Sequence, residues 1–505
     1  MGGPGTQETA AESTDPALAP IPCTSTSHDG QPSRETSNIQ LDETEEPLSW
    51  PASKKWLCTI VVVAMTATIG FCSSIHTAAI ADIAKSFNCS RTVATLGVST
   101  FLLGFATGPL IFGPLSEVWG RNAIYRSVLL LFVLSNIGCA LAPNISALLV
   151  FRFLCGFFGS PTVTNSGGSL TDMWPQSHRS VPLALFTAAS FLGPVIAPIV
   201  GGFIAQYSQW RWDYWIVAII SGLSYIAMLA VLPETYTPVL LAKKRARLAG
   251  RQPADSPSPK IDYYTTLTRP WVMLFTEPIL FLLSLYMAFC YGILYLDFTA
   301  YPIVFSTTRG WPPSLSGLSF LGIGLGMALS TACSPLINRV HTHYAAKLSS
   351  PLSPTSSPPE ARLPHLIPLA PLIPGALFWF ARTAAPPRHW AQPVAAGVPF
   401  GAGVAALFLA VAAYLTDCYG RRYAASALAA AAVLRSLFGA AFPLFGPAVY
   451  GALGVEWAGC VLGFVALGLA PLPWVFYVWG PWLRARSRFY LRAVEEDVED
   501  GRAAG

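Results

Sequence analysis

Acidic and basic residues lie unusually close together in the segment GPLSEVWGR (113–121), directly after a long apolar stretch. Charged groups beside hydrocarbon are costly unless they pair or cap helix ends. Two glycines in the same segment permit a tight turn between apolar helices. We therefore expect a loop that gates the membrane edge by changing conformation. Its predicted residues are Gly113, Glu117, Gly120, Arg121 and, on the following helix, Arg126.

Two further charged residues, Arg152 and Asp297, lie inside apolar stretches. An arginine in such a position is expensive unless it is paired or hydrated, so we expect Arg152 to face a polar cavity. The alternative is an arginine that joins helices through carbonyl oxygens. Burial favours the neutral form of Asp297, as a proton carrier requires. The alternative is a hydrogen-bonded carboxyl near the outer mouth. We predict that both residues couple protonation to binding.

Three tyrosines surround Asp297 in the segment YGILYLDFTAY (291–301). Tyrosine combines an apolar ring with a polar tip, so Tyr291 and Tyr295, together with Tyr301, are candidates for the wall of a planar ligand's site. Ordinary packing and interfacial anchoring is the competing interpretation.

A dense group of glycines and prolines lies in one apolar stretch, at Gly193, Pro194, Pro198, Gly201 and Gly202. Such residues let a helix bend and approach a neighbouring helix closely. We expect this segment to close one side of the molecule while the other side opens.

Several other polar residues have weaker interpretations. We expect Asp172 to pair with Arg179, and Asp417 to pair with Arg421 or Arg422, as structural latches. Arg435 is ambiguous, because an arginine near a leaflet can extend its charge to the surface. His76 is suited to titrate near neutral pH, although a packing histidine is the more common case.

The composition indicates a membrane protein. Of 505 residues, 53% are hydrophobic and 11% are charged, whereas soluble domains carry about 25% charged residues. Ten cysteines are scattered without metal-ligand spacing, so we predict no metal and no cofactor. The chain contains no Gly-x-x-x-x-Gly-Lys-Ser/Thr loop and no His-Glu-x-x-His motif. Without a nucleophile–base group, an enzyme is not expected. The basic run 243–251 favours a topology determinant over a nucleic-acid site.

Twelve apolar stretches are long enough to cross about 30 Å of hydrocarbon, which needs about 20 helical residues. They lie at 56–79, 93–115, 125–142, 147–170, 182–205, 214–233, 277–303, 315–338, 364–382, 391–415, 424–447 and 456–480. The predicted fold is all-α and integral to the membrane. It comprises a disordered tail (1–50), a six-helix bundle (51–234), a basic link (235–276), a second six-helix bundle (277–482) and a C-terminal tail (483–505).

The distribution of lysine and arginine predicts the orientation. With both termini in the cytoplasm, most flanking basic residues fall inside. Those outside are Lys85, Arg91, Arg211, Arg309, Arg382 and Arg388. The sequons at Asn88 and Asn144 then lie outside as candidate glycosylation sites, and the short loops close to the membrane disfavour modification of either. We expect a multi-pass protein of the plasma membrane.

The two halves resemble each other at an offset of 245 residues. Leu170-Thr-Asp172 recurs as Leu415-Thr-Asp417, and Trp212 matches Trp457 at the same offset. Leu192, Pro198 and Gly201 likewise match Leu437, Pro443 and Gly446. Two pseudo-symmetric six-helix halves are typical of transporters that rock about a midplane site.

The chain resembles the major facilitator superfamily, and within it the fungal twelve-span drug:proton antiporters, over residues 50–485. The 113–121 segment is similar to the family's loop between spans two and three, with Val118 and Asn122 where basic residues are usual. A degenerate copy lies at 334–339. RFLCG (152–156) is similar to the buried-arginine motif of proton transfer, APIVGG (197–202) to the antiporter motif, and PET (233–235) to the usual end of the sixth span.

The resemblance implies a monomeric proton antiporter, driven by the proton gradient, that exports small hydrophobic or amphiphilic compounds such as drugs, toxins or a fungal secondary metabolite. Its partners would be the substrate, protons and the lipid bilayer, with no nucleic acid. The nearest alternative is polyamine export. A non-transporting membrane sensor on the same fold is less favoured, because the tails are short or of low complexity.

Overall fold

A computed structural model describes residues 42, 45–175, 178–248, 263–348 and 358–493. It divides the chain into two units, Met1–Gln40 and Leu41–Gly505, and every described residue belongs to the second. The predicted disordered tail therefore lies outside the described residues up to position 41 and at 43–44, as does the C-terminal tail from 494 onward. Residues 45–50, which we assigned to that tail, include a short helix, η2 (Pro47–Ser49).

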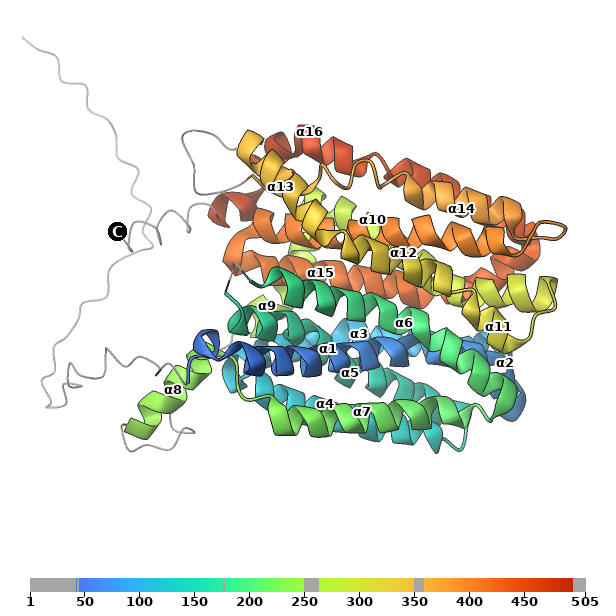
Figure 1. The fold of residues 1–505 in the computed structure, drawn as a ribbon, viewed down its shortest axis with the longest axis horizontal. Coiled ribbons are helices and arrows are strands. Elements are labelled where there is room, and N and C mark those ends of the chain that lie inside the picture. The colour runs from blue at the N-terminus through green and yellow to red at the C-terminus, as the bar shows by residue number, and fades with distance from the viewer. Residues whose placement is uncertain (1–41, 43–44, 176–177, 249–262, 349–357, 494–505) are drawn as a thin grey trace, which may run out of the picture. The chain divides into compact units, whose positions relative to one another are not determined.

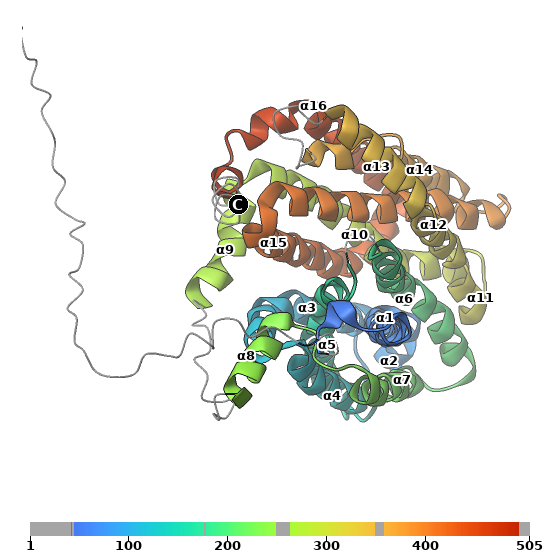
Figure 2. The same ribbon diagram turned by 60° about the vertical axis from the view of Figure 1, so that its left-hand side comes forward.

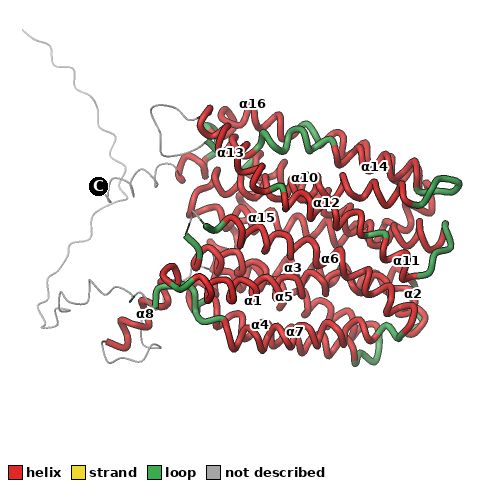
Figure 3. Tube along the Cα trace, in the orientation of Figure 1, coloured by secondary structure: helices red, strands yellow, loops and turns green. Residues whose placement is uncertain are grey.

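The described part of the chain is helical and contains no strand (Figure 3). A helix satisfies its backbone hydrogen bonds internally, which a segment surrounded by lipid requires. Among the described residues, ten helical stretches are long and apolar enough to cross a membrane. The last of them, Tyr423–Arg484, contains two of the predicted spans, and the predicted ninth span corresponds to α14, which is too short to be counted among the ten. Each of the twelve predicted spans thus has a helical counterpart.

The first half of the protein is built from six membrane-length stretches. The first stretch is α1 (Ala52–Ser74), continued by η3 (Ile75–Ala79) and α2 (Ile80–Ser86). The others are α3 (Arg91–Trp119), α4 (Arg121–Ala140), α5 (Ile145–Met173), α6 (Ser180–Tyr207) and α7 (Arg211–Val231). The link that follows contains α8 (Thr237–Leu248) and α9 (Tyr263–Thr276).

The second half begins with α10 (Pro278–Pro302), which runs into η5 (Ile303–Thr308). It continues through α11 (Pro313–Leu318), α12 (Leu321–Ala332), α13 (Ser334–Leu348), η6 (Pro359–Arg362), α14 (Leu372–Thr383), α15 (Ala391–Leu469) and α16 (Leu472–Arg484). The long α15 is three helices joined at Gly420 (φ +58°) and Gly454 (φ +72°), where left-handed backbone breaks the helix.

The ninth predicted span, 364–382, is helical only in its second part. Residues 363–371 form turns, and α14 begins after Pro371. Proline has no backbone N–H and its ring clashes with the preceding turn, so Pro364, Pro368 and Pro371 account for the late start.

The two halves lie side by side and meet along a limited set of helices (Figure 2). In the first half, α3 packs on α5 and α4 on α7. In the second, α14 and α10 pack on α15. Contacts between the halves are made by α6 with α11 and α12, and by α3 with α15.

The helices alternate in direction, so their connections gather at two opposite ends (Figure 1). We call the end that holds Trp50, Gly120 and α8 the link end. The opposite end, which holds Asn88 and Asn144, is the far end.

Candidate functional site: a cavity between the two halves

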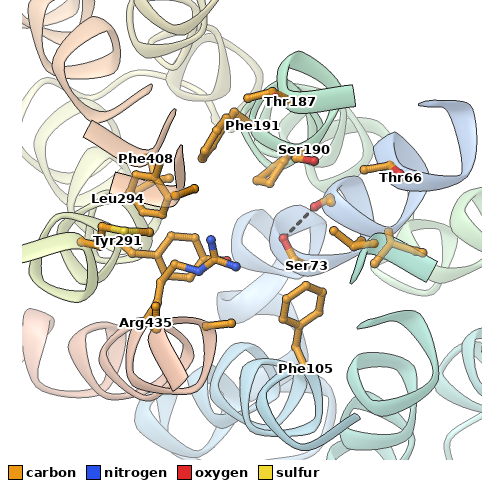
Figure 4. Close-up of a pocket in the computed structure, with 18 of the residues that line it drawn as sticks. Thr66, Ser73, Phe105, Thr187, Ser190, Phe191, Tyr291, Leu294, Phe408 and Arg435 are labelled. Atoms are coloured by element: carbon orange, nitrogen blue, oxygen red, sulfur yellow. Dashed lines mark hydrogen bonds between the residues drawn. The ribbon is translucent and has the colours of Figure 1, made fainter. Parts of the chain in front are cut away.

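A cavity of about 290 Å³ lies between the halves (Figure 4). It is lined by side chains of α1, α3, α5 and α6 from the first half and of α10 and α15 from the second. Ligand sites usually measure 300–1,000 Å³ and combine apolar walls with a few polar groups. The polar lining residues are Thr66, Ser73, Thr187, Ser190, Tyr291, Tyr295 and Arg435.

Helical spacing explains which residues of the eleventh span reach the cavity. Leu428, Ala431, Ala432 and Arg435 all line it. These positions are three, four and seven residues apart, so they share one face of the helix. The two alanines leave room in front of the backbone, and the arginine extends into that room.

Close contacts join the two halves at the far end. The Ser99 hydroxyl on α3 donates to the Ala440 carbonyl of α15 at 2.6 Å. On the other side, the Ser314 hydroxyl donates to the Gln206 side-chain oxygen at 2.5 Å. At the link end the cavity reaches Thr187, which lies near the start of α6. The halves are therefore in contact at the far end, and the cavity extends toward the link end.

Tyr291 and Tyr295, the predicted aromatic wall, both line the cavity. Their ring centroids are 4.8 Å apart, and the Tyr291 hydroxyl donates to the Tyr295 hydroxyl at 3.3 Å. Tyr295 in turn donates to the Ser73 hydroxyl of the first half at 2.9 Å. Tyr301 lies elsewhere, stacked on Phe320 and Phe380 within the second half.

Arg152 lies behind the cavity wall and not in the cavity. Its side chain is fully buried and donates to three backbone carbonyls: Gly97 at 2.8 Å, Cys72 at 2.9 Å and Ser73 at 3.1 Å. This arrangement is the helix-joining alternative, because the guanidinium holds α1 and α3 to α5. Ser73 nevertheless connects it to the cavity, since the Ser73 hydroxyl accepts from Tyr295.

A buried polar cluster surrounds Arg152. The His76 ring bonds to the Tyr214 hydroxyl through one nitrogen and to the Ala94 carbonyl at 2.8 Å through the other. Asp213, the neighbour of Tyr214 at the start of α7, is fully buried, and neither carboxyl oxygen has a hydrogen-bond partner. Arg152 lies close enough to act on this carboxyl electrostatically. The first half therefore contains a buried acid without a hydrogen-bond partner, which the sequence analysis did not single out.

Asp297 lies in a second, much smaller pocket inside the second half. Its side chain is 6% exposed, and its neighbours there include Tyr301, Phe380 and Tyr450. The pocket is separate from the residues that line the central cavity. A proton on Asp297 would therefore sit apart from a ligand in the cavity.

The predicted gating loop is shorter than expected. α3 remains helical to Trp119, so Gly113 is an ordinary helical residue, and the turn is confined to Gly120. Gly120 has φ +92° and ψ +158°, a conformation available essentially to glycine alone. A side chain here would also strike the Glu234 carboxylate.

Glu234 and Asp172 hold the start of α4. Glu234 accepts from the backbone N–H of Arg121 at 3.0 Å and of Asn122 at 3.2 Å. A carboxylate at a helix N-terminus satisfies free N–H groups and complements the helix dipole. The Arg121 side chain donates to Asp172 at 2.6 Å, which ties α4 to the end of α5. Asn122, where a basic residue is usual, donates to the Leu232 carbonyl.

The expected partner of Asp172 at this end of the molecule differs from the structure. Asp172 pairs with Arg121 and not with Arg179. Glu117 is exposed, and the salt bridge of Arg121 goes to Asp172, so the loop's own acid and base do not meet. Arg126 is exposed on α4 and takes no part in this salt bridge.

The second half contains an equivalent latch built from a different segment. Arg362 in η6 donates to Asp417 at 2.7 Å, as Arg121 does to Asp172. Arg362 is thus the partner of Asp417 in the described structure. The side chains of Arg421 and Arg422 lie outside the described residues, so the expected pairing with them stays a prediction. The repeat Leu-Thr-Asp correctly marked the acids of both latches.

The glycines of α6 permit close helix contacts. A β-carbon at Gly193 would lie 2.7 Å from the Ala67 carbonyl of α1, and one at Gly201 would lie 2.8 Å from that of Ile75. At Gly202 it would lie 2.5 Å from the Pro313 carbonyl of α11, across the boundary between the halves. Ser74 donates to the Pro194 carbonyl at 2.5 Å. This geometry supports the predicted sealing role, with Pro198 lying against Gly317.

Both predicted sequons lie at the far end with exposed asparagines. Asn88 has φ +50°, in the turn before α3. Asn144 caps α5, because its side-chain oxygen accepts from the Ala147 N–H at 2.8 Å. Glycosylation of either remains a prediction.

Sequence reasoning missed two residues that shape the site. Arg435 was left ambiguous, although its helical register with Ala431 and Ala432 placed it on a face of small residues, which signals a cavity. Ser73 carried no signal as a single residue, because its importance comes from Arg152 and Tyr295, which contact it from distant parts of the chain.

Comparison with known proteins adds independent findings. The family model described as the Major Facilitator Superfamily matches residues 62–353. The MFS-type efflux pump MFS2 of Trichophyton rubrum is 44% identical over 453 residues, covering 88% of this chain and 75% of that protein. The multidrug transporter mdrA of Aspergillus fumigatus is 41% identical over 463 residues, covering 90% of this chain and 75% of that protein. Among solved structures, the proton:xylose symporter XylE matches with a TM-score of 0.59 at 15% identity, covering 85% of this chain and 97% of its own; this likeness concerns the fold alone.

Proposed function

Because the chain belongs to the major facilitator superfamily, we propose that it is a proton-coupled antiporter that exports small hydrophobic or amphiphilic compounds, such as drugs, toxins or a secondary metabolite. Relatives described as an efflux pump and a multidrug transporter support export. The observation that carries the proposal is the cavity itself. It lies between two halves that touch at the far end, and its walls are mostly apolar, as a site for such compounds requires.

The link end faces the cytoplasm in this proposal, at the plasma membrane. Lys243, Lys244 and Arg245 of α8 lie at this end, and an excess of basic residues marks the cytoplasmic side. The exposed sequons at the opposite end agree with this orientation. The cavity then receives cargo from the cytoplasm. Since the cavity lies within one chain, we assign the activity to a monomer.

Protons bind away from the cargo in this scheme. Asp297 and Asp213 are both buried acids outside the cavity lining. Each is costly to keep charged where it is, so a proton that neutralises it relieves the cost. Arg152 links Asp213 to the cavity through Ser73, whose carbonyl accepts from Arg152 and whose hydroxyl accepts from Tyr295.

Export of polyamines is not favoured by the lining residues. A polycation in a low-dielectric cavity requires carboxylates, and the described lining contains none. Its charged residue is an arginine, which would repel a polyamine.

The test uses purified protein in liposomes with an imposed pH gradient and the neutral hydrophobic dye Nile red. We expect dye movement that depends on the gradient and stops when a protonophore collapses it. Spermidine in place of the dye should not move. If the gradient drives neither compound, antiport of neutral hydrophobic compounds is wrong, and if it drives spermidine alone, the polyamine alternative replaces our proposal. Dye movement without dependence on the gradient would leave export but remove proton coupling.

A further inference from the structure

We propose that the cavity selects small organic acids that carry an aromatic ring, and that Arg435 binds their anionic group. This inference rests on the proposed function, because it takes the cavity as the cargo site and names the class of cargo. Three observations carry it: the charge of the lining, the missing partners of Arg435, and the aromatic groups beside it.

The side chains that line the cavity carry a net positive charge. Among the described residues that line it, Arg435 is the one charged side chain, and no aspartate, glutamate, lysine or histidine accompanies it. A single guanidinium in an apolar enclosure produces a strong local positive potential, because low-dielectric walls screen it poorly. An anionic compound is attracted to this site and a cationic compound is repelled.

Arg435 lacks the carboxylate partner that three other arginines of the described structure have. Arg121, Arg362 and Arg484 each donate to a carboxylate at 2.6–2.8 Å. In the described structure Arg435 has no salt bridge, and its Nε is buried without a hydrogen-bond partner. An unpaired guanidinium in such a place is costly unless a ligand compensates it. Its planar fork of donors matches a carboxylate in two parallel hydrogen bonds.

The hydroxyl groups of the cavity are already engaged. Thr187 donates to the Leu183 carbonyl at 2.8 Å, and Ser190 donates to that of Phe186 at 2.9 Å. The two tyrosine hydroxyls and Ser73 form a chain of donors that ends on the Gly70 carbonyl at 2.6 Å. Arg435 is therefore the group in the described lining with free donors, and free donors recognise anions.

Aromatic rings hold the guanidinium and surround the space beside it. Arg435 lies over the ring of Tyr291 at 4.9 Å and over that of Phe408 at 5.4 Å, which orients it without an anion (Figure 4). Phe408 in turn meets Phe191 from the first half edge-to-face at 5.3 Å. Phe105 lies across the cavity in the same view. A flat ring fits between these groups while its carboxylate meets Arg435.

The experiment compares two probes of nearly equal shape, 2-naphthoate, which is anionic at neutral pH, and 2-naphthamide, which is neutral. Binding to the purified full-length protein in phosphatidylcholine nanodiscs is measured without any pH gradient. We expect naphthoate to bind about tenfold to a hundredfold more tightly, the range that charge-assisted hydrogen bonds provide. Arg435→Gln should remove this preference by weakening naphthoate alone, and Arg435→Lys should retain part of it.

The matched control is Arg382→Gln, which removes an exposed arginine at the far end, 72% exposed and paired with Glu456, and should change neither affinity. Equal binding of both probes to the unaltered protein would overturn the inference, whether or not a variant folds. An equal loss of affinity for both probes in Arg435→Gln would also overturn the inference. If adding phosphatidylglycerol to the nanodiscs abolishes naphthoate binding, the site belongs to a lipid headgroup and the inference is also wrong.

The result is separate from the test of antiport. Binding needs no gradient, so a protein that prefers naphthoate but shows no gradient-driven transport keeps this inference and loses the proposed coupling. Gradient-driven movement of Nile red together with equal affinity for both naphthalene probes keeps the proposed function and removes the inference.

Discussion

At the residue scale, the two arginines inside the membrane have opposite environments. Arg152 is fully buried and bonded to three carbonyls, while Arg435 lies in the cavity with unpaired donors. The first environment stabilises the first half of the protein, and the second leaves a charge available to a ligand. The buried carboxyl of Asp213 has no hydrogen-bond partner, and Arg152 is the positive charge that acts on it.

This pairing predicts the result of a double-mutant cycle. Arg152→Met removes donors from three buried carbonyls and leaves Asp213 without its compensating charge, so we expect a loss of about 3–5 kcal/mol of stability. Adding Asp213→Asn to the Arg152→Met variant removes the carboxylate charge that has lost its partner, and should recover part of the lost stability. The measurement is the thermal unfolding of the purified protein in detergent. Strictly additive effects of the two substitutions would show that the charges do not interact.

At the scale of elements, the predicted gating loop is reduced to a turn at Gly120, directly before the start of α4. Gly120 supplies the backbone conformation, Glu234 caps the helix, and Asp172 holds Arg121. Arg362 and Asp417 reproduce the last of these contacts in the second half. Equivalent partly buried salt bridges thus hold the link end in both halves, and the pair Arg484–Glu360 adds a third in the second half. The glycines of α6 bring helices together toward the far end.

Two glycines of the predicted loop should respond to alanine in opposite ways. Gly120→Ala forces a side chain into a conformation that costs about 1–3 kcal/mol and pushes it against the Glu234 carboxylate, so the melting temperature should fall. Gly113→Ala adds a methyl group where nothing lies within 4 Å, inside α3, and should be neutral or stabilise by about 0.5–1 kcal/mol. Thermal unfolding of both variants measures this contrast. Equal effects would mean that the turn is not confined to Gly120.

At the scale of the whole molecule, transport requires the halves to separate at the far end. In the present state they touch there through Ser99 and Ala440 and through Gln206 and Ser314. A transporter of two rocking halves exposes its midplane site alternately to the two sides. Contacts that cross between the halves at the far end must therefore break in every cycle, whereas those within a half need not.

Crosslinking distinguishes these two kinds of contact. Ser99→Cys with Ala440→Cys, joined by a short bifunctional thiol reagent, should stop gradient-driven dye movement and leave naphthoate binding intact, because the cavity still extends toward the link end. A reducing agent should restore transport if the crosslinker contains a disulfide. The control is Arg382→Cys with Glu456→Cys, which replaces a 2.5 Å salt bridge within the second half at the far end. Three native cysteines are first replaced by serine so that they do not react: Cys89 and Cys333, which are not buried, and Cys23, which lies outside the described residues. Undiminished transport after complete crosslinking of the first pair would contradict alternating access at this boundary.

Much of the fold could be predicted from the sequence because its signals are local. Crossing a bilayer requires long apolar helices, and these leave a clear hydropathy pattern, so each of the twelve predicted spans has a helical counterpart. The tyrosine wall was also found locally, since Tyr291 and Tyr295 lie one helical turn apart on the same face. The offset of 245 residues correctly marked Asp172 and Asp417 as equivalent acids.

Partners of charged groups could be identified only in the tertiary structure. Asp172 has Arg179 nearby in sequence but pairs with Arg121, and Asp417 pairs with Arg362 from another helical segment. Proximity along the chain does not decide such pairs, because neighbouring positions often point to different sides of a helix.

The sequence by itself thus determined the class of protein, the spans and the residues too costly to lie in lipid. The tertiary structure alone decided what each of those residues does. Arg152 and Arg435 are indistinguishable as single arginines in apolar helices, yet the carbonyls around one come from α1 and α3, and the rings around the other come from α10 and α15. The physical reason is that the free energy of a buried charge depends on the groups that solvate it, and helices distant in sequence supply them.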